Sequence, residues 1–193
     1  MIFCESPQSR RMAEACTRAR RLSGEWALLG QIAASNPEIL FIREWSQDGV
    51  TDIFTLGLRS TPAWESSESV RSVHEVEFRF PRFFPALPVE CFIDPPAFHP
   101  NIHPVTGFVC LWKAYCETET LLDAVLRLRS VLSAHSYNAS RDHVMQPEAL
   151  QYYEAFNPRL SQDPLQMPDE WLYQRTFGAR PVRQKRKRLQ AHP

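Results

Sequence analysis

The sequence of 193 residues predicts an α+β fold with an antiparallel sheet. Three observations lead to this prediction: helical periodicity early in the chain, four strand-like segments separated by turns, and two helical segments after a long irregular stretch. Because no helix separates the four strand-like segments, we expect them to form a meander, with the helices packed against it.

The first strong element is a helix from Arg21 to about Ser35. Its apolar residues recur at helical spacing, and the Asn36-Pro37 pair is a typical stop because proline disfavours helix in the residue before it. Residues 1–20 are arginine-rich with few apolar positions, which predicts a basic N-terminal extension. The apolar residues of the helix are Leu22, Trp26, Leu29 and Ala33.

Strand patterns then follow one another. Residues 39–45 and 51–59 are apolar and β-rich, and residues 46–49 between them favour a turn. Residues 73–80 alternate, with Val76, Phe78 and Phe80 on one face and charged residues on the other, which is typical of a strand with one buried face. A shorter strand is expected at residues 90–93, which completes a four-stranded meander.

The last elements are an irregular segment and two helices. Residues 94–117 contain several prolines and no sustained period, and long irregular segments in compact domains are usually functional. A helix should begin at Thr120, where Thr120 and Asp123 have the spacing of a capping box. A second helix should begin at Pro147, because proline is favoured at the first helical position.

The organisation that these elements predict is one domain with an extension at each end. The domain spans residues 21–157, between the basic segment 1–20 and a proline-punctuated segment 158–193 that carries a basic run at residues 183–188. A single domain is the expectation for a chain of this length.

Composition limits the class of protein. Apolar residues make up 44% and charged residues 23% of the chain, and no apolar run approaches the roughly 20 residues of a membrane span. The N-terminus places its apolar residues before its arginines, the reverse of a secretory signal. We therefore expect a cytoplasmic protein with no membrane partner, in which the five cysteines are free thiols.

The irregular segment contains the motif that points to a function. Phe98-His99-Pro100-Asn101-Ile102 is followed, nine residues after Asn101, by Cys110 in Gly107-Phe-Val-Cys-Leu-Trp112. Upstream stands Phe80-Pro81-x-x-Phe84-Pro85-x-x-Pro88, and downstream stands Gln146-Pro-Glu-Ala-Leu-Gln-Tyr-Tyr153. Together these motifs resemble the ubiquitin-conjugating enzyme family, over roughly residues 21–156. The resemblance implies the UBC fold.

The resemblance also implies an activity. A family member is an acyltransferase that receives a ubiquitin-like protein from an activating enzyme as a thioester on its cysteine, here Cys110, and passes it to a lysine amine of a target protein. Such a transfer needs no cofactor or metal, since the activating enzyme is the one that uses ATP. A thiolate is both a good nucleophile and a good leaving group, as this exchange requires.

Three other residues have roles in the resembling motif. Asn101 matches an asparagine that either donates a hydrogen bond to the oxyanion or supports the local loop. His99 matches a structural histidine that holds the turn, rather than a catalytic base. Asp142 is the candidate for activating the amine, and its alternative interpretation is an exposed aspartate.

The sequence departs from the family at the ligase-binding turn. Ala86 stands where many members have a large apolar residue, and the usual Ser-Pro-Ala loop is absent, which argues against dependence on a RING-type ligase. This divergence and the unmatched extensions predict a bacterial member of a small ubiquitin-like pathway, with a role in antiviral defence by analogy.

Alternatives from other functional classes remain open. A zinc protein could use His99, His103, Cys110 and Cys116, although their spacing fits no compact zinc motif. A non-catalytic adaptor of the same fold would bind ubiquitin-like proteins without carrying them. The basic C-terminal run has no interleaved aromatic residues, so we expect no nucleic-acid partner.

Overall fold

A computed structural model describes the backbone of residues 7–167 and the side chains of residues 17–167. Its centre is a five-stranded antiparallel sheet in the order β1-β2-β5-β6-β7. The strands are β1 (Leu40–Asp48), β2 (Thr51–Leu58), β5 (His74–Phe80), β6 (Glu90–Asp94) and β7 (Phe108–Val109). The predicted α+β meander is thus confirmed.

Two strand features lie outside the prediction. The two-residue strand β7 forms within the irregular segment and pairs with β6. A small separate hairpin, β3 (Ala63–Trp64) and β4 (Val70–Arg71), lies in the loop between β2 and β5. Strands of two residues are too short to show an alternating pattern, so periodicity could not reveal them.

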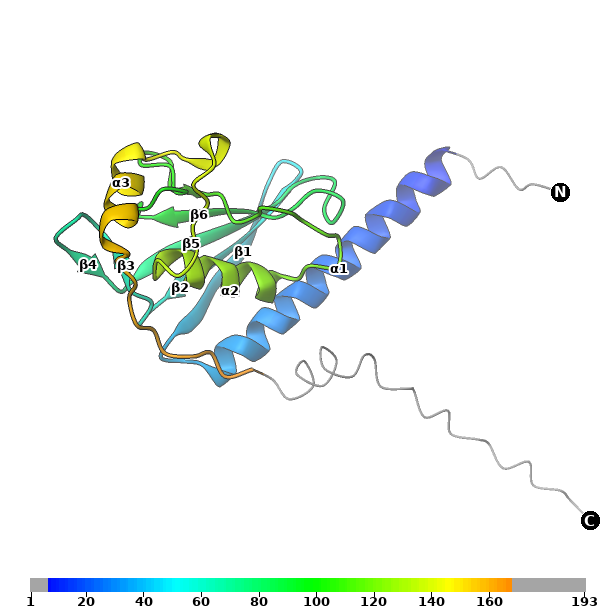
Figure 1. Cartoon of the computed structure of the whole chain (residues 1–193). Helices are drawn as coiled ribbons and strands as arrows, with labels where there is room; N and C mark the ends of the chain where they lie inside the picture. Colours follow the sequence, from blue (N-terminus) through cyan, green and yellow to red (C-terminus); the bar gives the residue numbers. More distant parts are fainter. Residues whose placement is uncertain (1–6, 168–193) are drawn as a thin grey trace, which may run out of the picture.

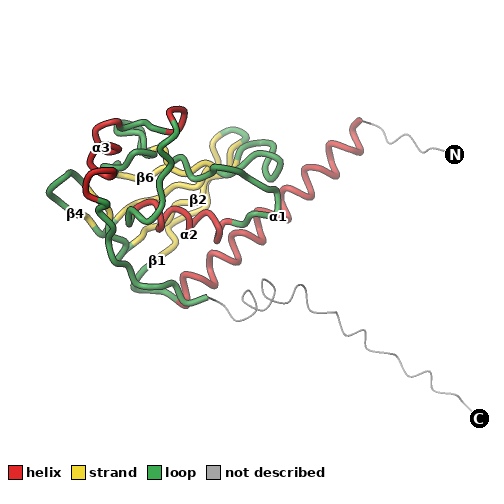
Figure 2. The backbone as a smooth tube through the Cα atoms, viewed as in Figure 1, coloured by secondary structure: helices red, strands yellow, loops and turns green. Residues whose placement is uncertain are grey.

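Three α-helices accompany the sheet: α1 (Pro7–Ser35), α2 (Leu121–Leu132) and α3 (Pro147–Phe156). A short 3₁₀ helix, η1 (Arg141–His143), lies between the last two. Figure 1 shows α2 lying across the sheet beside α1, with α3 at the opposite end of the molecule from the start of α1. Figure 2 shows that the chain leading from β6 to α2 is mostly loop.

The helix α1 begins at Pro7 rather than near Arg21. Its early part has few apolar residues and therefore gave no periodic signal, yet it reaches the domain through a charged contact. The Arg18 guanidinium pairs with the Asp52 carboxylate and donates to the Phe80 carbonyl at 3.0 Å. Part of the predicted basic extension is thus the first half of a long helix.

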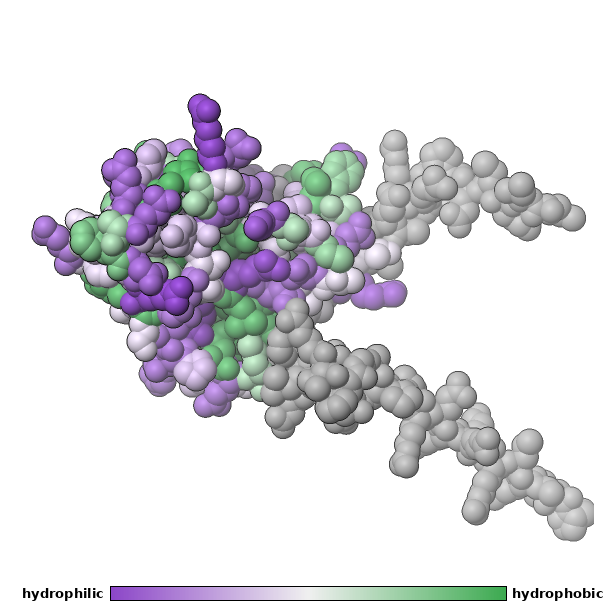
Figure 3. Space-filling view, viewed as in Figure 1, coloured by the Kyte–Doolittle hydropathy of each residue, from purple (hydrophilic) through white to green (hydrophobic). Residues whose placement is uncertain are grey.

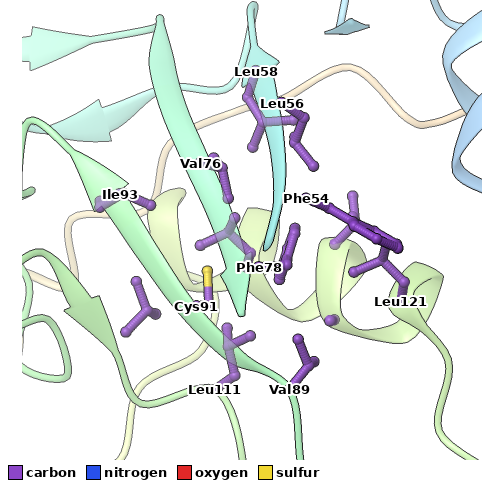
Figure 4. Packing of buried hydrophobic residues seen from close by; sticks show 14 of the residues in the cluster. Phe54, Leu56, Leu58, Val76, Phe78, Val89, Cys91, Ile93, Leu111 and Leu121 are labelled. Atoms are coloured by element: carbon purple, nitrogen blue, oxygen red, sulfur yellow. The ribbon is translucent and has the colours of Figure 1, made fainter. Parts of the chain in front are cut away.

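The core lies between the helices and one face of the sheet. Phe54, Val76 and Phe78 have no exposed surface, and in Figure 4 they converge with Cys91 of β6 and Leu121 of α2. On β5 these buried positions alternate with half-buried charged ones, as predicted. Figure 3 shows a largely hydrophilic surface on the viewed face, interrupted by separate apolar patches.

The chain beyond α3 continues to pack on the domain. Residues 158–167 run from the end of α3 to the C-terminal end of α1, as the orange segment in Figure 1 shows. The predicted boundary at residue 157 therefore coincides with the end of α3 but not with the end of the packed chain. The basic run at residues 183–188 lies outside the described residues. Between residues 7 and 167, no helix has the length and apolar character to cross a membrane.

Candidate active site

Cys110 lies directly after β7, on a backbone that its neighbours hold in place. Its N–H donates to the Asn101 carbonyl at 2.9 Å. Val109 and Leu111 on either side are buried, whereas Cys110 itself is only half-buried. The thiol is therefore carried on a fixed support and remains partly accessible.

A glycine allows this support to approach β6. Gly107 has a φ of +69°, and a Cβ at this position would collide with the Ile93 carbonyl oxygen. The Ile93 N–H in turn donates to the Gly107 carbonyl at 3.0 Å. Only glycine combines this backbone conformation with so close an approach.

His99 is buried and uses both ring nitrogens within the fold. Its Nδ1 accepts from the Asn101 N–H at 3.0 Å, and its Nε2 lies 3.3 Å from the Ser136 carbonyl. This pairing requires the neutral tautomer with the proton on Nε2. Burial lowers the pKa of His99 to about 3, partly offset by the hydrogen bond to Ser136. These contacts suit a residue that holds the turn, and none of them involves Cys110.

Asn101 uses its side-chain amide to hold the loop that follows α2. The Oδ1 accepts from the Asn138 N–H at 2.6 Å, and Nδ2 donates to the Asn138 carbonyl at 2.7 Å and to the His143 carbonyl at 2.8 Å. Both donor hydrogens of the buried amide are therefore occupied. Of the two roles that the sequence left open for Asn101, this arrangement corresponds to loop support.

The loop held by Asn101 brings a residue to the site that sequence reasoning missed. The His143 Nδ1 lies 3.0 Å from the Cys110 Sγ, although 33 positions separate the two residues in the sequence. His143 ends the 3₁₀ helix η1 and is half-buried. No motif spacing links it to Cys110; the only available signal was a titratable side chain next to Asp142 in the loop already under consideration.

Asp142 does not join the cysteine in this arrangement. It is exposed on η1, and among the described residues it has no hydrogen bond or ion pair. The candidate zinc ligands are not brought together either. In the described part of the chain, no three His, Cys, Asp or Glu side chains lie close enough to one another to hold a metal ion. Cys116 is exposed and contacts Thr118 instead.

The electrostatics of the site centre on one pair of groups. Burial raises the pKa of the Cys110 thiol, which disfavours the thiolate. The imidazole of His143 is the group in contact with the sulfur that can exchange a proton. The arrangement can therefore present a sulfur nucleophile beside a proton acceptor.

Comparison with known proteins gives a fold. No model of a protein family matches the sequence, and no curated protein matches it. A solved Trypanosoma cruzi protein assigned as a ubiquitin conjugating enzyme superposes with a TM-score of 0.51 at 19% identity, over 72% of this chain and 90% of that chain.

Two further structures match less closely. One is a Plasmodium yoelii protein assigned as a ubiquitin conjugating enzyme, with a TM-score of 0.49, 16% identity and coverage of 71% of this chain and 85% of that chain. The other is Ubc12 of S. cerevisiae, with a TM-score of 0.44, 12% identity and coverage of 85% and 100%. Because it superposes on the Trypanosoma cruzi structure, this chain has the fold of the ubiquitin-conjugating enzymes.

Proposed function

We propose that this protein is a ubiquitin-conjugating-enzyme-like transferase. It accepts a ubiquitin-like protein from an activating enzyme as a thioester on Cys110 and transfers it to a lysine amine of a target protein. The observation that carries the proposal is the placement of Cys110: a partly accessible thiol, on a backbone tied to Asn101, within a UBC fold.

The chemistry fits the groups that are present. Exchange between thioesters needs a sulfur nucleophile with defined backbone geometry, and attack by an amine then needs no cofactor. ATP is consumed by the activating enzyme, upstream of this protein. The setting that we propose is a bacterial ubiquitin-like pathway with a role in antiviral defence, for which the support is the divergence of the sequence from the resembling family.

The test is a loading assay with the full chain, the activating enzyme and ubiquitin-like protein of the source organism, and ATP. We expect a covalent adduct on a non-reducing gel that a thiol reagent reverses and that Cys110→Ala abolishes. The matched control is Cys116→Ala, which removes an exposed thiol outside the site and should load normally.

Two results would contradict the proposal. An adduct that forms on Cys110→Ala would place the acceptor elsewhere. Binding of the ubiquitin-like protein without any adduct, equal in wild type and Cys110→Ala, would instead identify a non-catalytic adaptor.

A further inference from the structure

The geometry points to His143 as a second catalytic residue. We propose that its imidazole receives the proton of the Cys110 thiol when the thioester forms, and the proton of the attacking amine when the thioester is discharged. The inference rests on the proposed function, in which Cys110 is the acyl carrier. It assigns the proton transfers that this function needs to a residue outside the His99-Pro100-Asn101 motif.

The contact itself is direct. A separation of 3.0 Å between Cys110 Sγ and His143 Nδ1 is within hydrogen-bond range for sulfur. A neutral imidazole with its proton on Nε2 accepts from the S–H at this distance, and a protonated imidazole donates to the thiolate. Cysteine beside histidine is a common arrangement for activating a thiol.

His143 is held in this position by the same segment that holds Cys110. Its carbonyl accepts from the Asn101 Nδ2 at 2.8 Å, and its N–H donates to the Ser140 carbonyl at 2.9 Å. Two residues later, the Met145 N–H donates to the Pro100 carbonyl at 2.7 Å. The backbone at and after His143 is thus tied to residues 100 and 101, and Asn101 also accepts from the Cys110 N–H, so the backbone segments that carry the imidazole and the sulfur are joined.

Among the side chains of residues 17–167, no other titratable group competes for this role. The ring nitrogens of His99 are both committed, and the Nδ1 of His103 accepts from the N–H groups of Val105 and Thr106. On η1, Arg141 and Asp142 are exposed, and neither has a hydrogen bond or ion pair with Cys110 among the described residues. His143 is therefore the only described titratable side chain hydrogen-bonded to the sulfur.

The proton transfers balance in both steps. During loading, the S–H proton moves to His143 Nδ1, the sulfur attacks the carbonyl carbon of the donor thioester, and the departing donor thiolate takes the proton from the imidazolium. During discharge, the amine attacks the Cys110 thioester and gives a proton to Nδ1. The C–S bond then breaks, and the imidazolium returns that proton to the Cys110 thiolate.

The test measures thiol reactivity and needs no modifier. Full-length protein is treated with iodoacetamide across a range of pH, and alkylation of the Cys110 peptide is followed by mass spectrometry. In wild type we expect Cys110 to be alkylated near neutral pH, because the adjacent imidazole can accept the thiol proton as the sulfur attacks. In His143→Gln, which keeps a polar side chain but cannot accept the thiol proton as a base, the alkylation rate near neutral pH should fall about tenfold or more.

A matched control and a folding check accompany this comparison. His135→Gln removes an exposed histidine that contacts Ser133 instead of Cys110, and its profile should equal that of wild type. Thermal unfolding of each variant shows whether a lower alkylation rate comes from misfolding. If His143→Gln does not fold, His143→Ala replaces it in the comparison.

The outcomes separate this inference from the proposed function. A folded His143→Gln with the wild-type pH profile overturns the role of His143, whether or not Cys110 loads. If the alkylation profile of His143→Gln differs from that of wild type, but wild type never forms a thioester, the Cys110–His143 pair stands and the conjugating function is contradicted. Loading and discharge at unchanged rates in His143→Gln would overturn the inference and leave the conjugating function standing.

Discussion

At the scale of the residue, Asn101 decides how the site is assembled. Its amide pairs with both the N–H and the carbonyl of Asn138, as one strand would pair with another, and its remaining hydrogen reaches the His143 carbonyl. The Asn101 carbonyl meanwhile accepts from the Cys110 N–H. A single residue thus joins the cysteine segment to the loop that delivers the histidine.

His99 should make stability depend on pH, because it is held neutral in the folded state. Its folded pKa of about 3 lies below the ordinary value of 6.5. The unfolded chain therefore binds more protons between these values, and stability is lost as pH falls below about 6.5. The slope from this one group is up to about 1.4 kcal/mol per pH unit within that window.

Urea unfolding of wild type and His99→Gln at several values between about pH 7 and pH 5 isolates this contribution. Glutamine does not titrate, so the difference in unfolding free energy between the two proteins should shrink on acidification. Burial also lowers the pKa of His74. Because His74 is present in both proteins, its contribution cancels in the difference between them. A difference that stays constant with pH would show that His99 does not carry the effect.

At the scale of the element, α1 and α2 are joined by one buried carboxylate. Glu25 of α1 accepts from the Leu121 N–H at 2.7 Å, at the first residue of α2, and from the Arg21 side chain at 2.6 Å. Burial raises the pKa of Glu25, while these two partners oppose the shift. The start of α2 is also closed locally by the predicted capping box of Thr120 and Asp123, which the structure confirms.

Removal of Glu25 should therefore weaken the packing of α1 on α2. We expect Glu25→Ala to lower the free energy of unfolding by about 1–3 kcal/mol, because it leaves the buried Leu121 N–H without its acceptor. Glu25→Gln should cost less, since an amide oxygen can still accept that hydrogen bond. Chemical denaturation measures both, with the exposed Glu154→Ala on α3 as control. Equal losses in the Ala and Gln variants would refute the capping role.

At the scale of the whole molecule, the segment of residues 158–167 ties distant elements together. Its Pro158 carbonyl accepts from the Trp64 indole N–H at 2.6 Å, and its Leu160 N–H donates to the Ser133 carbonyl at 2.9 Å. At its far end, Gln166 exchanges two backbone hydrogen bonds with the side chain of Asn36, at 2.7 and 2.9 Å. The segment therefore connects α3, the β3 hairpin and the end of α1.

Asn36→Ala should loosen this connection. The buried Asn36 side chain also donates to the Ile32 carbonyl at 2.8 Å, so its loss leaves several backbone groups unpaired. We expect the free energy of unfolding to fall by about 1–3 kcal/mol. Limited proteolysis should also cut residues 158–167 faster. The control is Gln31→Ala, an exposed position one turn earlier on α1. Unchanged proteolysis would mean that other contacts hold the segment.

The features that could be predicted from the amino-acid sequence are those with local causes. Alternation revealed β5, helical spacing and the Thr120–Asp123 pair placed the start of α2, and Pro147 marked the start of α3. Such signals depend on residues two to four positions apart, which the periods of strand and helix bring together in any fold. The motif around His99 and Cys110 was visible for the same reason, because its residues are close in sequence.

The contacts across the site and the packing of residues 158–167 join parts of the chain that are far apart in sequence. Asn101 contacts Asn138 and His143 from 37 and 42 positions away, and Gln166 reaches Asn36 from 130. No periodic pattern encodes such pairs, because they depend on how helices and loops pack around the finished sheet. The family resemblance offered Asp142 as the candidate, whereas the fold places its neighbour His143 against Cys110.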